Sequence, residues 1–121
     1  MSDHLRDMST RVSPDEIIRG HDGFYLRFPG REPPQEGFFC IVTGWCKFCH
    51  KLLKEMKEAR KARKFGVYHM VGDADLPSEI KMRDLGAKSY PAIFHVRADG
   101  KLTPYEGRRD AAALWAAARA F

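Results

Sequence analysis

The sequence lacks any apolar run that approaches the roughly 18 residues needed to cross a membrane. Its first residues, MSDHLRDMSTRVSPDE, contain no apolar segment typical of a secretory signal peptide. Its last residues, ARAF, match no retention or lipidation signal. We therefore expect no membrane partner and a cytoplasmic, reducing location.

Cysteine is also scarce, with three in 121 residues. In a reducing compartment, so few cysteines are more typical of catalysis or metal binding than of a disulfide framework. The sequence has no internal repeat and no low-complexity tract. A composition of 44% hydrophobic and 31% charged residues is ordinary for a soluble domain, and the length suffices for one modest core.

Two of the cysteines lie in GWCKFCHK, residues 44–51, which contains C-x-x-C-H. This spacing is compatible with haem attachment, with half of a zinc site, or with a dithiol that makes and breaks disulfides. Haem attachment needs an apolar pocket and usually export. Zinc needs four ligands, and there is no second C-x-x-C or H-x-x-H, while the other candidates, Cys40, His50, His69 and His95, are scattered.

The hydrophobic pattern places the cysteine pair between a strand and a helix. Residues 38–43 are continuously apolar and β-rich, whereas from Cys46 the apolar residues recur at helical spacing. Unpaired N–H groups at a helix start stabilise a thiolate, so Cys46 is expected to be exposed and reactive with Cys49 beneath it. Trp45 can shield the sulfurs and offer an apolar contact to a substrate. The expected element order is β, β, α, β, α, β, β, α, over residues 24–28, 38–43, 46–64, 67–71, 77–86, 92–97, 102–107 and 109–121.

At this point the chain resembles the thioredoxin superfamily, and most of all a catalytic domain of protein disulfide isomerase. FFCIVTGWCKFCHKL (38–52) is similar to the family's strand, W-C-x-x-C and helix. GAKSYPAIF (86–94) resembles the segment with a cis-proline, and DGKLTPYEGRR (99–109) resembles the terminal hairpin and the start of the last helix. The resemblance covers residues 37–121. It implies an α/β thioredoxin fold, with a central mixed sheet of four to five strands flanked by helices.

The same resemblance sets the expected domain boundaries. Residues 24–121 form the expected thioredoxin-like domain, with 24–28 as the first strand of its sheet. Residues 1–23 form an expected N-terminal extension, loose over 1–12 and with a short capped helical turn up to Gly20.

The resemblance also assigns roles to residues. Cys46 would be the nucleophile that forms a mixed disulfide, and Cys49 the resolving cysteine. Pro91, in cis, would face the pair and leave the backbone of Tyr90 free to bind an extended substrate. Arg109 matches the arginine that helps to deprotonate the second cysteine.

One departure concerns proton transfer. The family keeps a buried acid six residues before the first cysteine, where this chain has Cys40. A lysine that often pairs with this acid corresponds to a position near Val71, so both charges are absent together. His50 and His69 are the candidate substitutes that could move the proton of Cys49.

A second departure lies between the cysteines. Lys47 places a positive charge beside the Cys46 thiolate, which should make the disulfide easier to reduce, while Phe48 adds no proton chemistry. Arg108 is the alternative candidate for the arginine that helps to deprotonate the second cysteine.

The motif and the resemblance together predict a thiol–disulfide oxidoreductase without a cofactor or metal. It would be a monomer that acts on protein or peptide thiols and disulfides with an unidentified reductase or oxidant.

The segment from Lys47 to Lys64 contains eight Lys and Arg residues and only two acidic residues, Glu55 and Glu58. They form either a solvated helix face or a surface for acidic partners, and nucleic acid is disfavoured because no aromatic residue interleaves after Phe48. Other readings are a glutathione-dependent glutaredoxin, whose later motifs are missing, and a non-enzymatic adaptor, which buried cysteines would favour.

Overall fold

A computed structural model describes residues 9–28, 34–43, 46–62, 65–72, 82–87 and 90–118. None of its described helices is both long and apolar enough to cross a membrane. The elements follow in the order β1 (Thr10–Arg11), η1 (Pro14–Glu16), β2 (Ile17–Gly20), β3 (Gly23–Leu26), β4 (Gly37–Val42), α2 (Lys47–Ala62), β5 (Gly66–Val71), η2 (Met82–Leu85), β6 (Ala92–Val96), β7 (Leu102–Pro104) and α4 (Ala111–Ala118).

Five strands form one mixed sheet in the order β1-β5-β4-β6-β7. β4 runs parallel to β5 and antiparallel to β6, and β7 pairs antiparallel with β6 at the edge. Pro104 ends β7, so its missing N–H falls on an edge strand, where the sequence predicted it. This architecture confirms the predicted mixed sheet flanked by helices.

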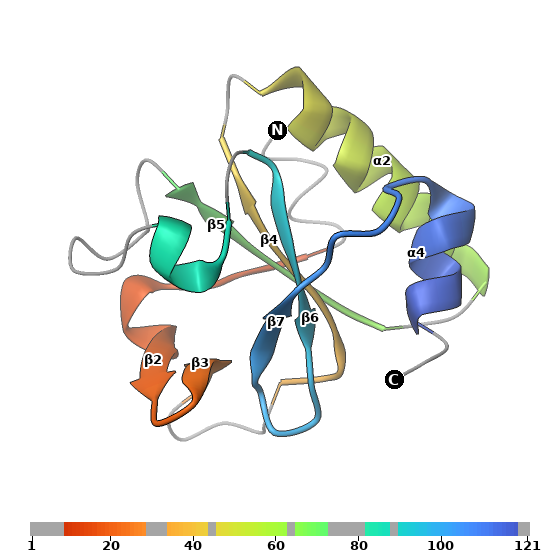
Figure 1. Ribbon diagram of the computed structural model, residues 1–121. Coiled ribbons are helices and arrows are strands. Elements are labelled where there is room, and N and C mark those ends of the chain that lie inside the picture. The colour runs from red at the N-terminus through yellow and green to blue at the C-terminus, as the bar shows by residue number, and fades with distance from the viewer. Residues whose placement is uncertain are drawn as a thin grey trace.

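The central strand β4 is buried over its whole length because both faces of the sheet are covered. Phe38, Cys40 and Val42 share one core cluster with residues of α2 and α4. Phe39 and Ile41 point to the other face and belong to a second cluster. Figure 1 shows α2 and α4 together on one side of the sheet, with the β2–β3 hairpin and η2 on the other.

The N-terminal segment differs from the sequence prediction. Thr10–Arg11 pairs in parallel with β5, and Val12 is fully buried, so residues 10–12 are not loose. The helical turn ends at Glu16 instead of Gly20, because the β-branched pair Ile17–Ile18 continues as a strand.

Residues 24–28 are also placed differently from the prediction. β3 pairs with β2 in a separate two-stranded hairpin and is not the first strand of the main sheet. Val12 and Ile17 nevertheless share a core cluster with Leu26. The division into 1–23 and 24–121 stays a prediction. Of the helix expected over 77–86, residues 77–81 lie outside the described residues, and the described part contains the short 3-10 turn Met82–Leu85.

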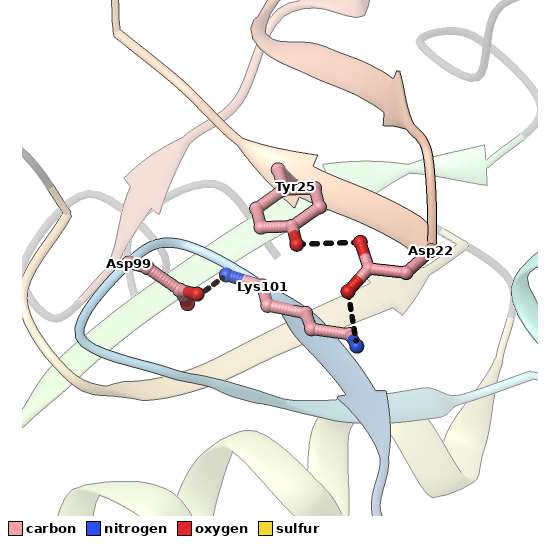
Figure 2. Close-up of polar contacts among 4 residues, drawn as sticks. All are labelled: Asp22, Tyr25, Asp99 and Lys101. Carbon is pink, nitrogen blue, oxygen red and sulfur yellow. Dashed lines mark hydrogen bonds and ion pairs between the residues drawn. The ribbon is translucent and has the colours of Figure 1, made fainter.

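Hydrogen bonds join the two hairpins at the end of the sheet opposite the cysteine pair. Figure 2 shows the Asp22 carboxylate accepting bonds from the Tyr25 hydroxyl at 2.7 Å and the Lys101 ammonium at 3.1 Å. Asp99 accepts a bond from the backbone N–H of Lys101 at 3.0 Å. Both partners lower the pKa of Asp22, with the Tyr25 hydrogen bond as the larger cause. These contacts connect β2–β3 to β6–β7, so the hairpin is held against the main sheet.

Candidate active site

The two cysteines of the motif lie where β4 passes into α2. β4 ends at Val42, Cys46 directly precedes α2, and Cys49 lies in its first turn. The backbone N–H of Cys49 donates to Cys46 Sγ at 3.2 Å. A donor at a helix N-terminus stabilises negative charge on that sulfur, so the geometry suits a nucleophilic thiolate.

Both cysteines of the pair are free and buried, which corrects the expectation of an exposed Cys46. Cys46 is 4% exposed and Cys49 is 0% exposed. Cys46 belongs to the core cluster that also contains Val42 and Ile93. Apolar residues from two strands therefore enclose a sulfur that the sequence pattern alone placed at the surface.

The thiol of Cys49 strongly resists ionisation. Burial raises its pKa to about 12, and the hydrogen bond and charge of Cys46 act in the same direction. A hydrogen bond from the backbone of Thr43 and the charge of Arg109 act against this rise. Cys49 therefore needs a proton acceptor before it can attack another sulfur.

The third thiol, Cys40, lies in the same core cluster as the pair. Burial raises its pKa to about 12, with a further contribution from the charge of Cys49. Arg109 opposes this shift. Cys40 is thus a neutral group at the position that the resemblance reserves for a buried acid, so it is ill suited to accept a proton from Cys49 near neutral pH.

Neither of the two histidines predicted to replace the buried acid occupies the position of that acid. His50 is exposed on α2. His69 is 4% exposed and pairs with Cys40 in the parallel register of β4 and β5. Its Nδ1 lies 2.6 Å from the Ser9 hydroxyl, so this ring nitrogen already has a hydrogen-bond partner.

The Tyr90–Pro91 peptide bond is cis. β6 pairs with β4 through Ala92 and Ile41, so Pro91 lies beside the end of β4 that leads to Cys46. Tyr90 packs against the core cluster that contains Cys46. The predicted proline segment and the cysteine pair are therefore brought to the same end of the sheet.

Arg109 connects two hollows near this end. It lines one hollow of about 290 Å³ together with Pro91 and Tyr105. It also lines a second hollow of about 360 Å³ with Phe48 and Leu52. Phe48 is 72% exposed, so it offers an apolar contact directly between the two cysteines.

Glu55 is a positioning residue that the sequence analysis did not identify. Its Oε2 accepts a hydrogen bond from the N–H of Ala111 at 3.2 Å, and Asp110 Oδ1 accepts one from Ala113 at 3.0 Å. These bonds satisfy N–H groups at the start of α4 and tie that start, next to Arg109, to α2. The only signal in the sequence was that Glu55 is one of two acids among eight basic residues, and such an acid could equally have faced solvent.

The remaining predicted site residues are placed as follows. Lys47 is exposed at the start of α2, and Arg108 is exposed and pairs with Asp110 at 2.9 Å. Trp45 lies outside the described residues. Within the described part of the chain, no three His, Cys, Asp or Glu side chains gather as metal ligands.

The chain matches no family model and no curated protein sequence. Its structure is similar to the J-Trx1 fragment of ERdj5, with a TM-score of 0.56 and 23% identity over 71% of this chain. It is also similar to the zinc-bound form of human ERp44, with a TM-score of 0.57 and 18% identity over 72% of this chain. The chain spans 41% of the ERdj5 fragment and 26% of the ERp44 chain.

Chloroplastic thioredoxin z is similar over a larger share, with a TM-score of 0.63, 16% identity and coverage of 93% of both chains. Thioredoxin-type domains are what these neighbours have in common, and their arrangement of sheet and helices is the one described above. The chain therefore has the thioredoxin fold that the three sequence blocks predicted.

Proposed function

We propose that this protein is a thiol–disulfide oxidoreductase that acts on protein or peptide disulfides through Cys46 and Cys49. The observation that carries the proposal is the 3.2 Å contact from the Cys49 N–H to Cys46 Sγ at the start of α2. It gives one sulfur of the C-x-x-C pair a donor that stabilises its thiolate.

In the reductive direction, the Cys46 thiolate attacks one sulfur of a substrate disulfide. A Cys46–substrate disulfide forms, and the other substrate sulfur leaves as a thiolate. Cys49 then loses its proton and attacks Cys46 Sγ, which releases the second substrate thiolate and leaves a Cys46–Cys49 disulfide. The substrate gains two electrons, and a dithiol reductant must return two electrons to the protein; the oxidative direction is the reverse.

The surroundings of the pair support roles for five further residues. Phe48 and the segment Tyr90–Pro91 would contact the substrate, because both lie beside the cysteines. The charge of Arg109 favours the thiolate of Cys49 and would assist the second attack. Lys47, exposed next to Cys46, would favour the reduced form and so raise the reduction potential.

A non-enzymatic thioredoxin-like adaptor is the second candidate, and the burial of Cys46 favours it. Turnover of insulin disulfides with dithiothreitol separates the two candidates. We expect the wild-type protein to accelerate insulin reduction, Cys46→Ser to abolish it, and Cys40→Ser to retain most of it. Full turnover in Cys46→Ser, or none in the wild type, would reject the enzyme and leave the adaptor.

A further inference from the structure

One side of α2 carries a hollow of about 700 Å³. Among the described residues, it shares Lys51 with the hollow of about 360 Å³ at Arg109. Its floor includes Leu53, which is only 2% exposed. Its rim is almost entirely basic, and the basic or acidic residues that line it are His50, Lys51, Lys54, Lys57, Glu58 and Lys61.

Most of this charge is not neutralised. Glu58 is the acid of the group, and it pairs with Lys61 at 3.0 Å. Within the described residues, neither Lys51, Lys54 nor Lys57 has a carboxylate within 4 Å. These three lysines are all exposed and recur at three-residue steps, which places them along one side of the helix. We call them, with Lys61, the basic stripe.

The stripe begins next to the cysteine pair. Lys51 lies two residues after Cys49, and the stripe continues to Lys61 near the far end of α2. At about 1.5 Å per residue, its ten-residue length is roughly 15 Å. One end of a chain segment lying along the stripe would therefore come within one helical turn of Cys49 along the helix axis.

We propose that the basic stripe binds an acidic segment of the protein whose disulfide or thiol reacts with Cys46. The role in delivering that group rests on the proposed function, whereas the binding of the acidic segment does not. Charge complementarity identifies the occupant, because exposed lysines without a carboxylate partner suit successive Asp and Glu side chains. Nucleic acid fits less well, because none of the described residues that line the hollow is a Phe, Tyr or Trp on which a base could stack.

Two disulfide peptides with the same cysteine-containing core test the proposal, one with a tail of Asp and Glu and one with a tail of Ser and Gly. At low salt, we expect Lys54→Glu and Lys57→Glu each to lower kcat/KM for the acidic peptide by about threefold or more. The uncharged peptide should change less than about 1.5-fold, and the loss should shrink in 0.5 M salt. Arg97→Glu is the matched control, since it reverses one exposed charge in the turn at the opposite end of β6.

Binding of a cysteine-free acidic peptide, followed by fluorescence anisotropy, tests the stripe without any redox chemistry. Weaker binding by Lys54→Glu and Lys57→Glu, but not by Arg97→Glu, supports the proposal even if the protein reduces no disulfide. An equal loss in all three variants would show a net-charge effect and overturn it. Tighter binding of a single-stranded oligonucleotide of the same charge would also overturn it, because the stripe would then be a general polyanion surface.

Discussion

At the scale of single residues, the main feature is that the thiols of Cys49 and Cys40 are buried and resist ionisation. In the proposed reaction Cys49 must ionise to resolve a mixed disulfide, yet burial raises its pKa to about 12. Cys40, where the resemblance expects an acid, has a pKa of about 12 as well and holds its own proton. The positive group that acts on both thiols is Arg109, which lowers the pKa of each.

We therefore expect Arg109→Met to slow resolution of the mixed disulfide. Without the charge of Arg109 the pKa of Cys49 would lie higher still, so less thiolate would be present at a given pH and the step should slow by roughly threefold. Because Cys49 is protonated at neutral pH, the rate should rise with pH in both proteins, with the variant displaced toward higher pH. Release of glutathione from a Cys46–glutathione disulfide, followed by stopped flow between pH 6 and 9, measures this.

Arg108→Met is the control for Arg109. Arg108 carries the same charge one residue earlier, but its side chain is 85% exposed and pairs with Asp110 at 2.9 Å. It does not contribute to the pKa shift of Cys49. A larger effect in Arg108→Met than in Arg109→Met would reverse the assignment of the two arginines.

The sequence predicted the residues of this site better than their surroundings. C-x-x-C at a strand–helix boundary is a local pattern, and the structure places Cys46 and Cys49 there. The burial of Cys46 could not be predicted, because it depends in part on Ile93, which joins its core cluster only through the pairing of β4 with β6. Contacts between distant segments leave no periodicity in the sequence.

At the scale of elements, long apolar or amphipathic segments were predicted well. β4 and α2 lie within one or two residues of their predicted starts, since each carries its full hydrophobic pattern within one segment. The two-residue strand β1 was missed, because both of its residues are exposed and its pairing depends on β5. The strand β2 was missed because the capping signal at Ser13 suggested a longer helical turn.

The contact between α2 and α4 gives a prediction for element stability. Glu55→Ala removes the acceptor for the Ala111 N–H and should lower the free energy of unfolding by about 1 kcal/mol, as loss of a helix cap does. Glu58→Ala is the matched control on the same helix. Its exposed pair with Lys61 should be worth at most about 0.5 kcal/mol.

Urea denaturation of both variants at pH 7 under reducing conditions measures the difference. Glu55→Gln keeps an oxygen acceptor and should recover most of the loss. Equal stability of Glu55→Ala and Glu58→Ala would mean that the Glu55 contact does not hold the start of α4.

At the scale of the whole molecule, the two ends of the sheet carry different groups of residues. The cysteine pair, Pro91 and Arg109 gather where β4 ends and β6 begins. At the other end, the contacts of Asp22, Tyr25 and Lys101 hold the hairpins together. The central strand β4 connects the ends, and its burial on both faces makes Cys40 part of the core as well as a neighbour of the site.

The burial of Cys40 predicts how the stability of the whole domain depends on pH. In the unfolded chain its thiol ionises near its usual pKa of 9.0, whereas in the folded protein the pKa is about 12. Between these values the unfolded chain has lost a proton that the folded protein keeps, so rising pH favours unfolding. The contribution of Cys40 is constant below pH 9 and falls by about 1.4 kcal/mol per pH unit above it.

Cys40→Ser removes this titration while keeping a small side chain, and it leaves Cys46 and Cys49 in place. Its own cost to stability should be nearly independent of pH, because a serine hydroxyl does not ionise in this range. Urea denaturation of wild type and Cys40→Ser at pH 8, 9, 10 and 10.5, with reductant present, measures both slopes. We expect the wild type to lose about 1.4 kcal/mol per pH unit more than the variant above pH 9. Parallel slopes would show that Cys40 ionises as readily in the folded protein as in the unfolded chain, and hence that it is not sealed in the core.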